Sequence, residues 1–363
     1  MRFSSRLVQG WALVLAILVG GCATIPEPER RPPVFVPPPP RPISRPQAPA
    51  ADYRLNPPPG LAANLDSLAR SFAGKLGIAV MRTDGNWLYV YQGDQLFPQQ
   101  SVSKFWVALT VFDAVDAGRV TLDQKVSITK ADLTLFHQPI AELVGTEGFD
   151  TNVSELLLRA MTQSDNTAND SLLRTVGGPE AVRAMLTRKG IDGVRFGPGE
   201  RLLQSKTAGL TWHQNYATNG NFFKARNALP DGARQAALDT YLLNLPDGAQ
   251  PQAIVRALAR LKQGQLLSPN STRVLLSLMN ESQTGKQRVR GGVPYDWSYG
   301  HKTGTGQELA GLSTGYNDVG IMTAPDGTSY ALAVMIASTR VGIPARQAMM
   351  QGVSVAIAAA HRK

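Results

Sequence analysis

The stretch Gln99 to Thr110, Gln-Gln-Ser-Val-Ser-Lys-Phe-Trp-Val-Ala-Leu-Thr, places Ser101 and Lys104 three residues apart at the start of an apolar helical pattern. Residues i and i+3 share one face of a helix, so we expect the Lys104 amine to lie beside the Ser101 hydroxyl. Unpaired N–H groups and the positive end of the helix dipole also favour negative charge that develops at a helix start. The stretch therefore predicts a nucleophile with a neighbouring base.

A second Ser-x-x-Lys pattern, Ser127-Ile128-Thr129-Lys130, provides an internal comparison. It lies on an alternating run from Lys125 to Thr129, which is typical of a strand. Neither of the two partner motifs described below stands at a workable distance from it. We therefore interpret this copy as structural and place the chemistry at Ser101.

The first 22 residues form a separate segment, with Arg2 and Arg6, an apolar run from Trp11 to Val19, and small residues before Cys22. The apolar run is too short to span a bilayer. Its ending resembles a bacterial lipoprotein signal, which predicts a signal peptide over 1–21, lipidation of Cys22, and a periplasmic, membrane-anchored lipoprotein. An ordinary signal peptide with an incidental cysteine is the alternative. Cys22 is the only cysteine, which excludes an internal disulfide.

Residues 22–60 are expected to form a proline-rich tether, because 14 of the 34 residues from Pro26 to Pro59 are proline and no periodic apolar pattern appears. In polyproline geometry this segment reaches on the order of 100 Å. A Pro-x-x-Pro ligand for a partner domain is the alternative use.

The net charge of +10 does not predict nucleic-acid binding, since the basic residues are scattered and no basic stripe with interleaved aromatics appears. Seven arginines lie in the signal and tether: Arg2, Arg6, Arg30, Arg31, Arg41, Arg45 and Arg54. A basic surface near anionic lipid or peptidoglycan remains open.

Residues 61–363 are predicted to form one α+β domain, and 43% hydrophobic content supports a substantial core. Strand patterns occur near both ends of this region, with helical patterns between them. We therefore expect an antiparallel sheet built from both ends of the domain and flanked by helices, an all-helical lobe over about 100–270, and a site between them. The expected helices are 61–75, 153–162, 168–176, 271–279 and 344–360, and the expected strands are 77–82, 87–92, 297–303, 313–323 and 329–338.

Two further polar motifs follow the Ser101 stretch. Ser164-Asp165-Asn166 falls between two helical patterns, where such residues commonly cap a helix but can also point a hydroxyl and an amide at a ligand. The second motif, Lys302-Thr303-Gly304-Thr305-Gly306, ends a strand pattern, and its glycines let a backbone pass close to a substrate. Each motif alone is unspecific.

Ser-x-x-Lys, Ser-Asp-Asn and Lys-Thr-Gly in this order are the signature of class A β-lactamases and penicillin-binding proteins. From about Leu61 to the C-terminus the chain resembles the class A β-lactamase family. Gly177-Gly178-Pro179 and the stretch Leu266-Leu267-Ser268 before a helix are also similar to the family's pattern.

The resemblance implies a role for each matching residue. Ser101 is the acylated nucleophile, Lys104 its neighbouring base or proton relay, and Ser164 the proton shuttle to the leaving nitrogen. Asn166 binds a substrate side-chain amide, and Lys302, Thr303 and Gly304 bind the substrate carboxylate region. The backbone N–H groups of Ser101 and Thr305 form the oxyanion hole. These roles suit acyl transfer, which needs an activated hydroxyl, a proton path and donors aimed at the oxyanion.

Glu200 matches the family's deacylating glutamate in Glu200-Arg201-Leu202-Leu203-Gln204, with an exposed loop carboxylate as the alternative. Three residues depart from the family's pattern. Gln204 replaces an asparagine, and Asp170 replaces an asparagine facing the glutamate, which should raise the pKa of one carboxyl of the pair. Pro198 replaces the arginine that anchors the omega loop, so that loop must be held in another way.

Several further positions carry open alternatives. Arg288 stands at a place similar to that of an arginine which, in a subset of the family, reaches the substrate carboxylate, a task that suits a planar fork; the alternative is a surface arginine. Phe136 lies either at the cleft mouth or in the core. Segment 205–250, which is longer than the family's loop, is a lid, a partner surface or part of the packed domain. The four histidines, His137, His213, His301 and His361, have no metal-ligand spacing and support neither a zinc site nor a Ser-His-Asp triad.

On this resemblance we predict a monomeric serine β-lactamase of class A type that acts on small-molecule β-lactams without metal or cofactor. It forms an acyl-enzyme on Ser101, and Glu200 activates the deacylating water, as expected for antibiotic resistance and β-lactam catabolism. One alternative is a D,D-peptidase similar to penicillin-binding proteins, which acylates but scarcely deacylates; Asp170 and Gln204 favour it. The other is a non-catalytic cell-wall or β-lactam-binding protein.

Overall fold

The computed structural model describes residues 56–85 and 87–361. The predicted signal peptide, Cys22 and most of the predicted tether lie outside these residues. The described part begins its regular structure at helix α1 (Pro59–Ser71), so this helix starts two residues before the predicted domain. No helix in the described part is both long enough and apolar enough to cross a membrane.

The centre of the domain is a six-stranded antiparallel sheet in the order β2-β1-β10-β9-β7, with β8 paired to β9. β1 and β10 are neighbours, so the sheet joins the two ends of the domain, as predicted. The strands are β1 (Gly74–Arg82), β2 (Leu88–Tyr91), β7 (Ser298–Thr305), β8 (Glu308–Leu309), β9 (Leu312–Thr323) and β10 (Ser329–Thr339). The predicted helix 61–75 was too long, because Lys75 already pairs with Ser338 in the sheet.

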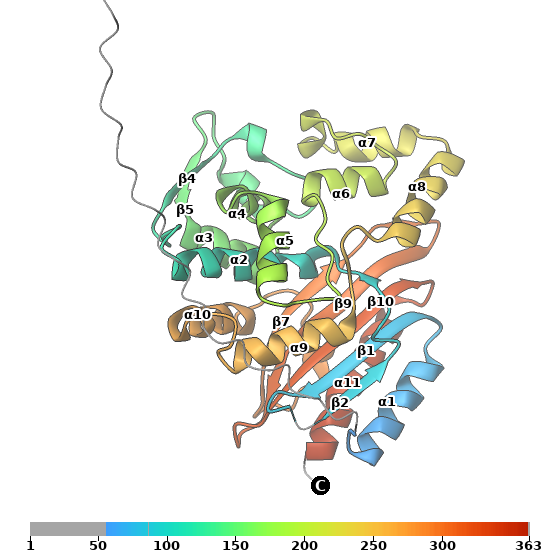
Figure 1. The fold of residues 1–363 in the computed structure, drawn as a ribbon. Coiled ribbons are helices and arrows are strands. Elements are labelled where there is room, and N and C mark those ends of the chain that lie inside the picture. The colour runs from blue at the N-terminus through green and yellow to red at the C-terminus, as the bar shows by residue number, and fades with distance from the viewer. Residues whose placement is uncertain (1–55, 86, 362–363) are drawn as a thin grey trace, which may run out of the picture. The chain divides into compact units, whose positions relative to one another are not determined.

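Both faces of the sheet are covered by helices (Figure 1). Ile78 and Val80 of β1 point into a core shared with α1 and with α11 (Ile343–His361), whereas Ala79 and Met81 point into the core on the opposite face. That opposite face is covered by α9 (Pro251–Lys262), and α10 (Pro269–Asn280) packs on β7. Burial on both faces explains why β1 is a nearly continuous apolar run.

The lobe beside the sheet is built around α2 (Lys104–Asp116), which is buried along almost its whole length. Around it lie α3 (Val153–Leu158), the π-helical turn Arg159–Gln163, α4 (Asn166–Thr175) and α5 (Pro179–Arg188). The prediction of an all-helical lobe was incomplete, because β4 (Lys125–Ile128) pairs with β5 (Phe149–Asn152). The lobe's predicted range also included α9, which belongs to the sheet layer. The second Ser-x-x-Lys copy begins in β4, as predicted.

Segment 205–250 packs on the domain. It contains the end of α6 (Glu200–Thr207), a 3-10 turn at Gln214–Ala217, α7 (Asn221–Ala228) and α8 (Asp231–Asn244). Leu238, Tyr241 and Leu245 form a small core with Leu203 of α6, and partly buried leucines of β8 and β9 pack against it. Its last residues, Gly248–Ala249 (β6), pair with Phe97–Pro98 (β3), directly before the nucleophile stretch.

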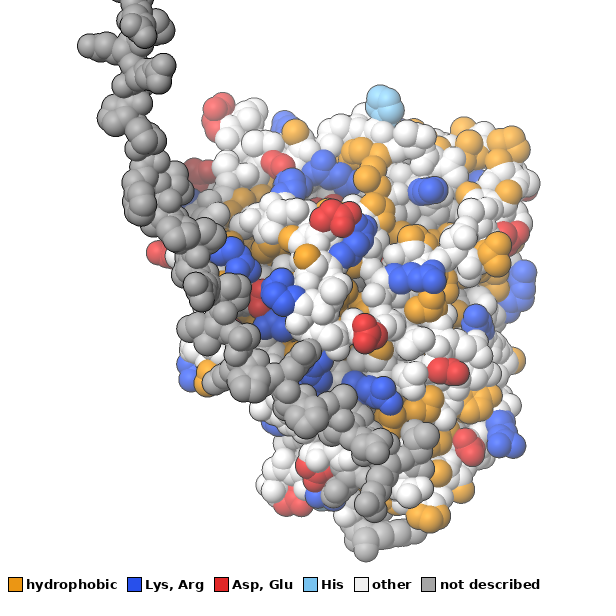
Figure 2. Space-filling model, in the orientation of Figure 1, with side chains coloured by type: hydrophobic (Ala, Val, Ile, Leu, Met, Phe, Trp, Pro, Cys, Tyr) orange, Lys and Arg blue, Asp and Glu red, His pale blue; other side chains and the backbone are white. Residues whose placement is uncertain are grey.

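The surface carries no continuous basic stripe on the face shown in Figure 2, where lysine and arginine side chains are separated by acidic, apolar and uncharged ones. This distribution agrees with the expectation from the sequence that the positive net charge is scattered. A nucleic-acid footprint would instead gather the basic side chains along one face or groove.

Candidate active site

The Ser101 hydroxyl lies beside the Lys104 amine. Ser101 occupies a 3-10 turn (Gln100–Ser103) that leads directly into α2, whose first residue is Lys104. Because side chains at i and i+3 eclipse in a 3-10 turn, Lys104 Nζ donates a hydrogen bond of 2.7 Å to Ser101 Oγ. The contact expected from the sequence is therefore present, with Lys104 fully buried and Ser101 half-buried.

Glu200 is the acidic partner of this pair. It is the first residue of α6, which follows Gly199 at a φ of 97°, a backbone conformation that favours glycine. Its carboxylate is buried and forms an ion pair with Lys104 through Oε1. The alternative of an exposed loop carboxylate is therefore wrong, and Lys104 joins the nucleophile to a carboxylate.

Asp170 of α4 faces Glu200, and its Oδ1 accepts a 3.1 Å hydrogen bond from the Glu200 backbone N–H. Burial, together with the Glu200 carboxylate, raises the pKa of the Asp170 carboxyl. The ion pair with Lys104 distinguishes Glu200 from this neighbour.

Replacing Asp170 by asparagine is expected to stabilise the protein by on the order of 1 kcal/mol at pH 7. Folding raises the pKa of the Asp170 carboxyl, so this group lowers the stability of the protein as the pH rises from the pKa in the unfolded state to the pKa in the folded state. The stability gained by Asp170→Asn should therefore be smaller at pH 4. Urea unfolding at both pH values measures the difference, with the exposed Asp150→Asn as control. An equal effect of Asp170→Asn at both pH values would contradict this explanation.

Gln204 lies one turn after Glu200 and contacts it. Gln204 Nε2 lies 3.3 Å from Glu200 Oε2 and 2.9 Å from Gln100 Oε1. On its other side, Gln307 Nε2 lies 2.8 Å from the Gln204 carbonyl oxygen and 3.2 Å from its Oε1. The glutamine that replaces the family's asparagine thus remains within reach of Glu200.

The Ser164-Asp165-Asn166 motif combines helix capping with a side chain in the site. Asp165 caps α4 by accepting a 2.9 Å hydrogen bond from Ala168 N. Ser164 has a left-handed φ of 63°, and its hydroxyl accepts a 2.8 Å bond from Lys302 Nζ. Asn166 Nδ2 donates to the Leu135 carbonyl at 2.7 Å. Capping and a site role for Ser164 are therefore compatible.

Lys302 is buried between the two lobes. Burial, followed by the positive charges of Lys104 and Arg288, lowers the pKa of the Lys302 amine well below its ordinary value. Next to it, the Thr303 hydroxyl lies 2.7 Å from the hydroxyl of Thr284. Lys302 thus joins β7 to Ser164.

Gly304 lets β7 approach the nucleophile turn. A Cβ on this residue would lie 2.3 Å from the Gln99 carbonyl oxygen, a distance that no side chain tolerates. The absence of a side chain therefore brings the strand carrying Thr305 against the turn carrying Ser101. The oxyanion hole from the N–H groups of these two residues remains a prediction that suits this approach.

Arg288 is buried, so the alternative of a surface arginine is wrong. Its guanidinium donates to the carbonyl oxygens of Gly304 at 2.9 Å and Asn317 at 2.6 Å, and to Thr305 Oγ1 at 2.6 Å. It also lies 3.8 Å from the ring centroid of Tyr316. Arg288 thereby places a fixed positive charge behind the strand that carries Thr303 and Thr305.

Phe136 is partly exposed, at 38%, so it does not belong to the core. It has a left-handed φ of 59° and packs edge-on against Phe222 of α7, with ring centroids 5.1 Å apart. Phe223 lies 5.9 Å from Phe136 by the same measure. Segment 205–250 thus contributes two aromatic rings beside Phe136.

The loop before Glu200, which lacks the family's arginine at Pro198, is held by hydrogen bonds to Gln99. Gln99 Nε2 donates to the carbonyl oxygens of Arg195 and Asp247, both at 2.9 Å. The Arg195 N–H also bonds the Gly248 carbonyl at 2.7 Å. Backbone carbonyls and one buried amide therefore fix this loop to the nucleophile turn.

The sequence did not single out a polar cluster of Gln100, Tyr241 and Asp247 next to the nucleophile. Tyr241 OH donates to Asp247 Oδ1 at 2.9 Å, and Gln100 N donates to Asp247 Oδ2 at 2.8 Å. Burial raises the pKa of Asp247 to about 6, and burial with the Asp247 charge raises that of Tyr241 well above its ordinary value. No local pattern marks these residues, because they come from distant segments.

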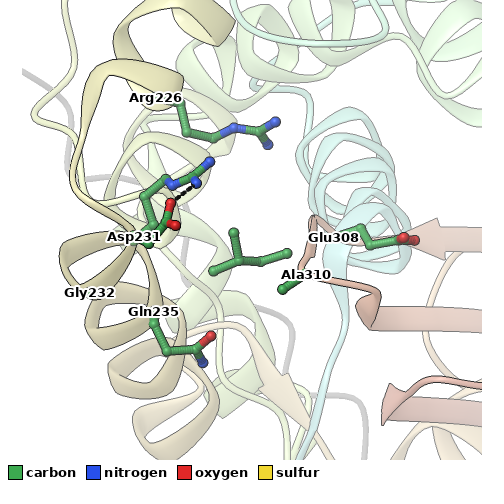
Figure 3. A pocket seen from close by; sticks show the side chains of 8 residues that line it. Arg226, Asp231, Gly232, Gln235, Glu308 and Ala310 are labelled. Carbon is green, nitrogen blue, oxygen red and sulfur yellow. Dashed lines mark hydrogen bonds and ion pairs between the residues drawn. The ribbon is translucent and has the colours of Figure 1, made fainter.

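A cavity of about 470 Å³ opens between α7, α8 and β8, and none of the residues named above as site residues lines it. Figure 3 shows Arg226 on one side and Glu308 on the other. Asp231 pairs with Arg234 on the α8 side. The reacting groups therefore lie elsewhere, between α2, α6 and β7.

His301 precedes Lys302 in the sequence, but its side chain lies in the interior of the domain and contacts Asp318. It is fully buried, and its Nδ1 lies 2.7 Å from Asp318 Oδ1. Within the residues that the structure describes, no three His, Cys, Asp or Glu side chains come together in a way that could hold a metal ion.

The sheet-and-lobe architecture places a serine, two lysines and a glutamate between its layers, an arrangement that suits a serine acyl-transfer enzyme. The model of the β-lactamase enzyme family matches residues 60–360, and the chain belongs to this family.

Individual relatives agree with this assignment. The chain is similar to β-lactamase VEB-1 of Pseudomonas aeruginosa, with 26% identity over 77% of this chain and 83% of that protein. A β-lactamase of Bacteroides uniformis is 28% identical over 75% of this chain and 81% of its own length. The crystal structure of a β-lactamase from Chitinophaga pinensis matches with a TM-score of 0.68 at 28% identity, covering 83% of this chain and 99% of that one. A reconstructed ancestral class A β-lactamase variant of Gram-negative bacteria matches with a TM-score of 0.64 at 30% identity, over 84% and 99%.

Proposed function

We propose that the protein is a serine β-lactamase that opens the β-lactam amide through an acyl-enzyme on Ser101. The observation that carries this proposal is the contact chain from Ser101 Oγ through Lys104 Nζ to Glu200 Oε1. It supplies a nucleophile, a proton path and a carboxylate in one connected unit. Membership of the β-lactamase family supports the same chemistry.

In the acylation step, Ser101 Oγ attacks the lactam carbonyl while its proton leaves through Lys104 towards Glu200. The Ser101–acyl bond forms and the lactam C–N bond breaks. The leaving nitrogen takes a proton from the Ser164 hydroxyl, which Lys302 Nζ holds at 2.8 Å. The Ser101 proton then passes from Glu200 through Lys104 to Ser164, so that Ser164 regains its proton and Glu200 is again free to accept one. The Lys302 amine and the guanidinium of Arg288 suit the carboxylate that most β-lactams carry beside this nitrogen.

In the deacylation step, Glu200 takes a proton from a water molecule, whose oxygen attacks the acyl carbonyl. The acyl–Ser101 bond then breaks, and the proton returns from Glu200 through Lys104 to Ser101 Oγ. A carboxylate base for this step must be ionised at working pH. Glu200 is buried and contacts Lys104, which joins it to the nucleophile. A carboxylate held in contact with the Ser101–Lys104 pair favours turnover over the D,D-peptidase alternative.

A time course of intact protein mass after mixing with benzylpenicillin tests the proposal. We expect an adduct of one penicillin that appears and decays while substrate continues to disappear, and no adduct on Ser101→Ala. A lasting adduct on the unmodified protein would favour the D,D-peptidase. Absence of both adduct and hydrolysis would favour the binding protein.

We further propose that the protein is a periplasmic lipoprotein that works as a monomer, anchored through Cys22. The charged, apolar and small-residue pattern before Cys22 supports the anchor. All side chains named for the reaction come from one chain, which suits a monomer. Incorporation of a labelled fatty acid in cells tests the anchor, and a mature protein that carries no lipid would contradict it.

A further inference from the structure

A chain of buried hydrogen bonds joins helix α8 of the long segment to Glu200. Tyr241 OH lies 2.9 Å from Asp247 Oδ1 and accepts from Gln100 Nε2 at 2.5 Å. Gln100 Oε1 in turn accepts from Gln204 Nε2 at 2.9 Å, and Gln204 Nε2 reaches Glu200 Oε2 at 3.3 Å. Each of these side chains is at least nine-tenths buried.

The chemistry of these groups fixes which group donates and which accepts in each hydrogen bond between Tyr241 and Glu200. An ionised Asp247 carboxylate only accepts, so the single proton of the Tyr241 hydroxyl points towards it. The tyrosine oxygen must then accept from the Gln100 amide nitrogen, which leaves Gln100 Oε1 facing Gln204. Gln204 consequently presents its amide N–H groups to both Gln100 and Glu200.

The chain holds Glu200 from the side opposite to Lys104. Lys104 contacts Oε1 and Gln204 contacts Oε2, so both carboxylate oxygens have a donor. Gln307 Nε2 lies 3.2 Å from Gln204 Oε1, which opposes a flip of the Gln204 amide. The Glu200 carboxylate is therefore held by Lys104 and Gln204, and the Gln204 amide is held by Gln307 and by the hydrogen bonds that lead through Gln100 to Tyr241.

The same cluster supports the backbone before the nucleophile. Gln100 has a left-handed φ of 52°, which is costly for a residue other than glycine. The 2.8 Å bond from its N–H to Asp247 Oδ2 opposes relaxation of this conformation. Asp247 thus supports the turn of Ser101 through the backbone of Gln100, whereas Tyr241 acts towards Glu200 through the side chain of Gln100.

We propose that Tyr241 is a positioning residue for deacylation, holding the Glu200 carboxylate through Gln100 and Gln204 in the orientation that water activation requires. This inference rests on the proposed β-lactamase function. It assigns segment 205–250 a role as a brace of the deacylating carboxylate, where the sequence left a lid or a partner surface open.

Tyr241→Phe separates the hydroxyl from the packing of the ring. The ring packs with Leu203, Leu238 and Leu245, and phenylalanine keeps those contacts. Without the hydroxyl, the Gln100 amide loses the acceptor that fixes its orientation. If the Gln100 amide flips, its nitrogen faces the amide nitrogen of Gln204. Gln204 then loses its hydrogen bond to Gln100, and its N–H donor to Glu200 is held less firmly.

The test measures acylation and deacylation separately in the full-length protein with benzylpenicillin, by quenched-flow intact mass. In Tyr241→Phe we expect the adduct to decay about tenfold more slowly, the effect of about one hydrogen bond. Its rate of formation should stay within about twofold. Where deacylation limits turnover, kcat and KM should fall together, with kcat/KM unchanged.

Two further variants control the experiment. Gln100→Met, which removes the amide but keeps the length of the side chain, should slow adduct decay to a similar extent. Leu238→Ala loosens the packing around Tyr241 but removes none of the hydrogen bonds between Tyr241 and Glu200. It should lower the melting temperature and leave the ratio of the rates of adduct formation and decay unchanged.

Normal adduct decay in both Tyr241→Phe and Gln100→Met would overturn the inference while leaving the β-lactamase function intact. An equal change of the rate ratio in Leu238→Ala would also overturn it, because packing would then explain the effect. Failure of the unmodified protein to form any adduct would instead contradict the proposed function.

Discussion

Glu200→Gln is expected to convert a transient penicillin adduct into a persistent one. Glutamine keeps the size of the side chain but cannot accept a proton from water at neutral pH, so deacylation should slow by about 10²- to 10⁴-fold. Adduct formation should be affected less, provided that Lys104 can still take the Ser101 proton. The mass spectrum after substrate is exhausted should then show mainly acylated protein.

Adduct decay after removal of free penicillin measures this effect. Glu147→Gln, a change at an exposed glutamate, serves as the control and should decay like the unmodified protein. Rapid decay of the adduct on Glu200→Gln would show that another group activates the water. Failure of Glu200→Gln to form an adduct would show that Glu200 is also required for acylation.

Lys104→Met should damage both the reaction and the fold. The ammonium group bonds the nucleophile and neutralises Glu200 in a fully buried position. Without it, Glu200 and Asp170 become two buried carboxyls with no counterion from Lys104. Removing one partner of a buried pair costs about 3–5 kcal/mol of stability. Loss of the proton path should lower kcat/KM by at least about 10³-fold.

The stability loss of Lys104→Met should be larger at pH 7 than at pH 4, because Asp170, with its raised pKa, is mostly protonated in acid. Urea unfolding at both pH values measures it. Lys189→Met, which removes the 2.8 Å ion pair between the half-buried Lys189 and Asp113, is the matched control with a smaller expected loss. Equal losses in the two variants would contradict the importance of burial at Lys104.

The fold could be predicted because its signals are local or follow from simple pairing rules. The apolar runs that became β1, β9 and β10 are visible in the sequence, and the positions of these runs near the two ends predicted a sheet made from both. Similarly, the spacing of Ser101 and Lys104 predicted their contact. The predicted element ends differed by a few residues, as at Lys75, because pairing with β10 outweighs the local helical pattern.

The remainder of the site depends on contacts between distant segments. Tyr241 reaches Gln100 across 141 positions of the chain, and no periodicity connects the two. Arg288 could not be distinguished from a surface arginine, because its carbonyl partners lie on β7 and β9. Glu200 was identifiable by its place in a motif, whereas its burial depends on the packing of α6 against neighbouring elements.

The pairing of β1 with β10 also determines when the protein can fold. During synthesis, β1 and β2 emerge first, yet the strand that joins them to the rest of the sheet, β10 (Ser329–Thr339), is made after every other strand of that sheet. Until then the apolar faces of this hairpin have no sheet to join, and such distant pairing makes folding slow. The nascent chain therefore stays without its complete central sheet until β10 has been made, and a chain truncated before β10 keeps β1 paired only with β2.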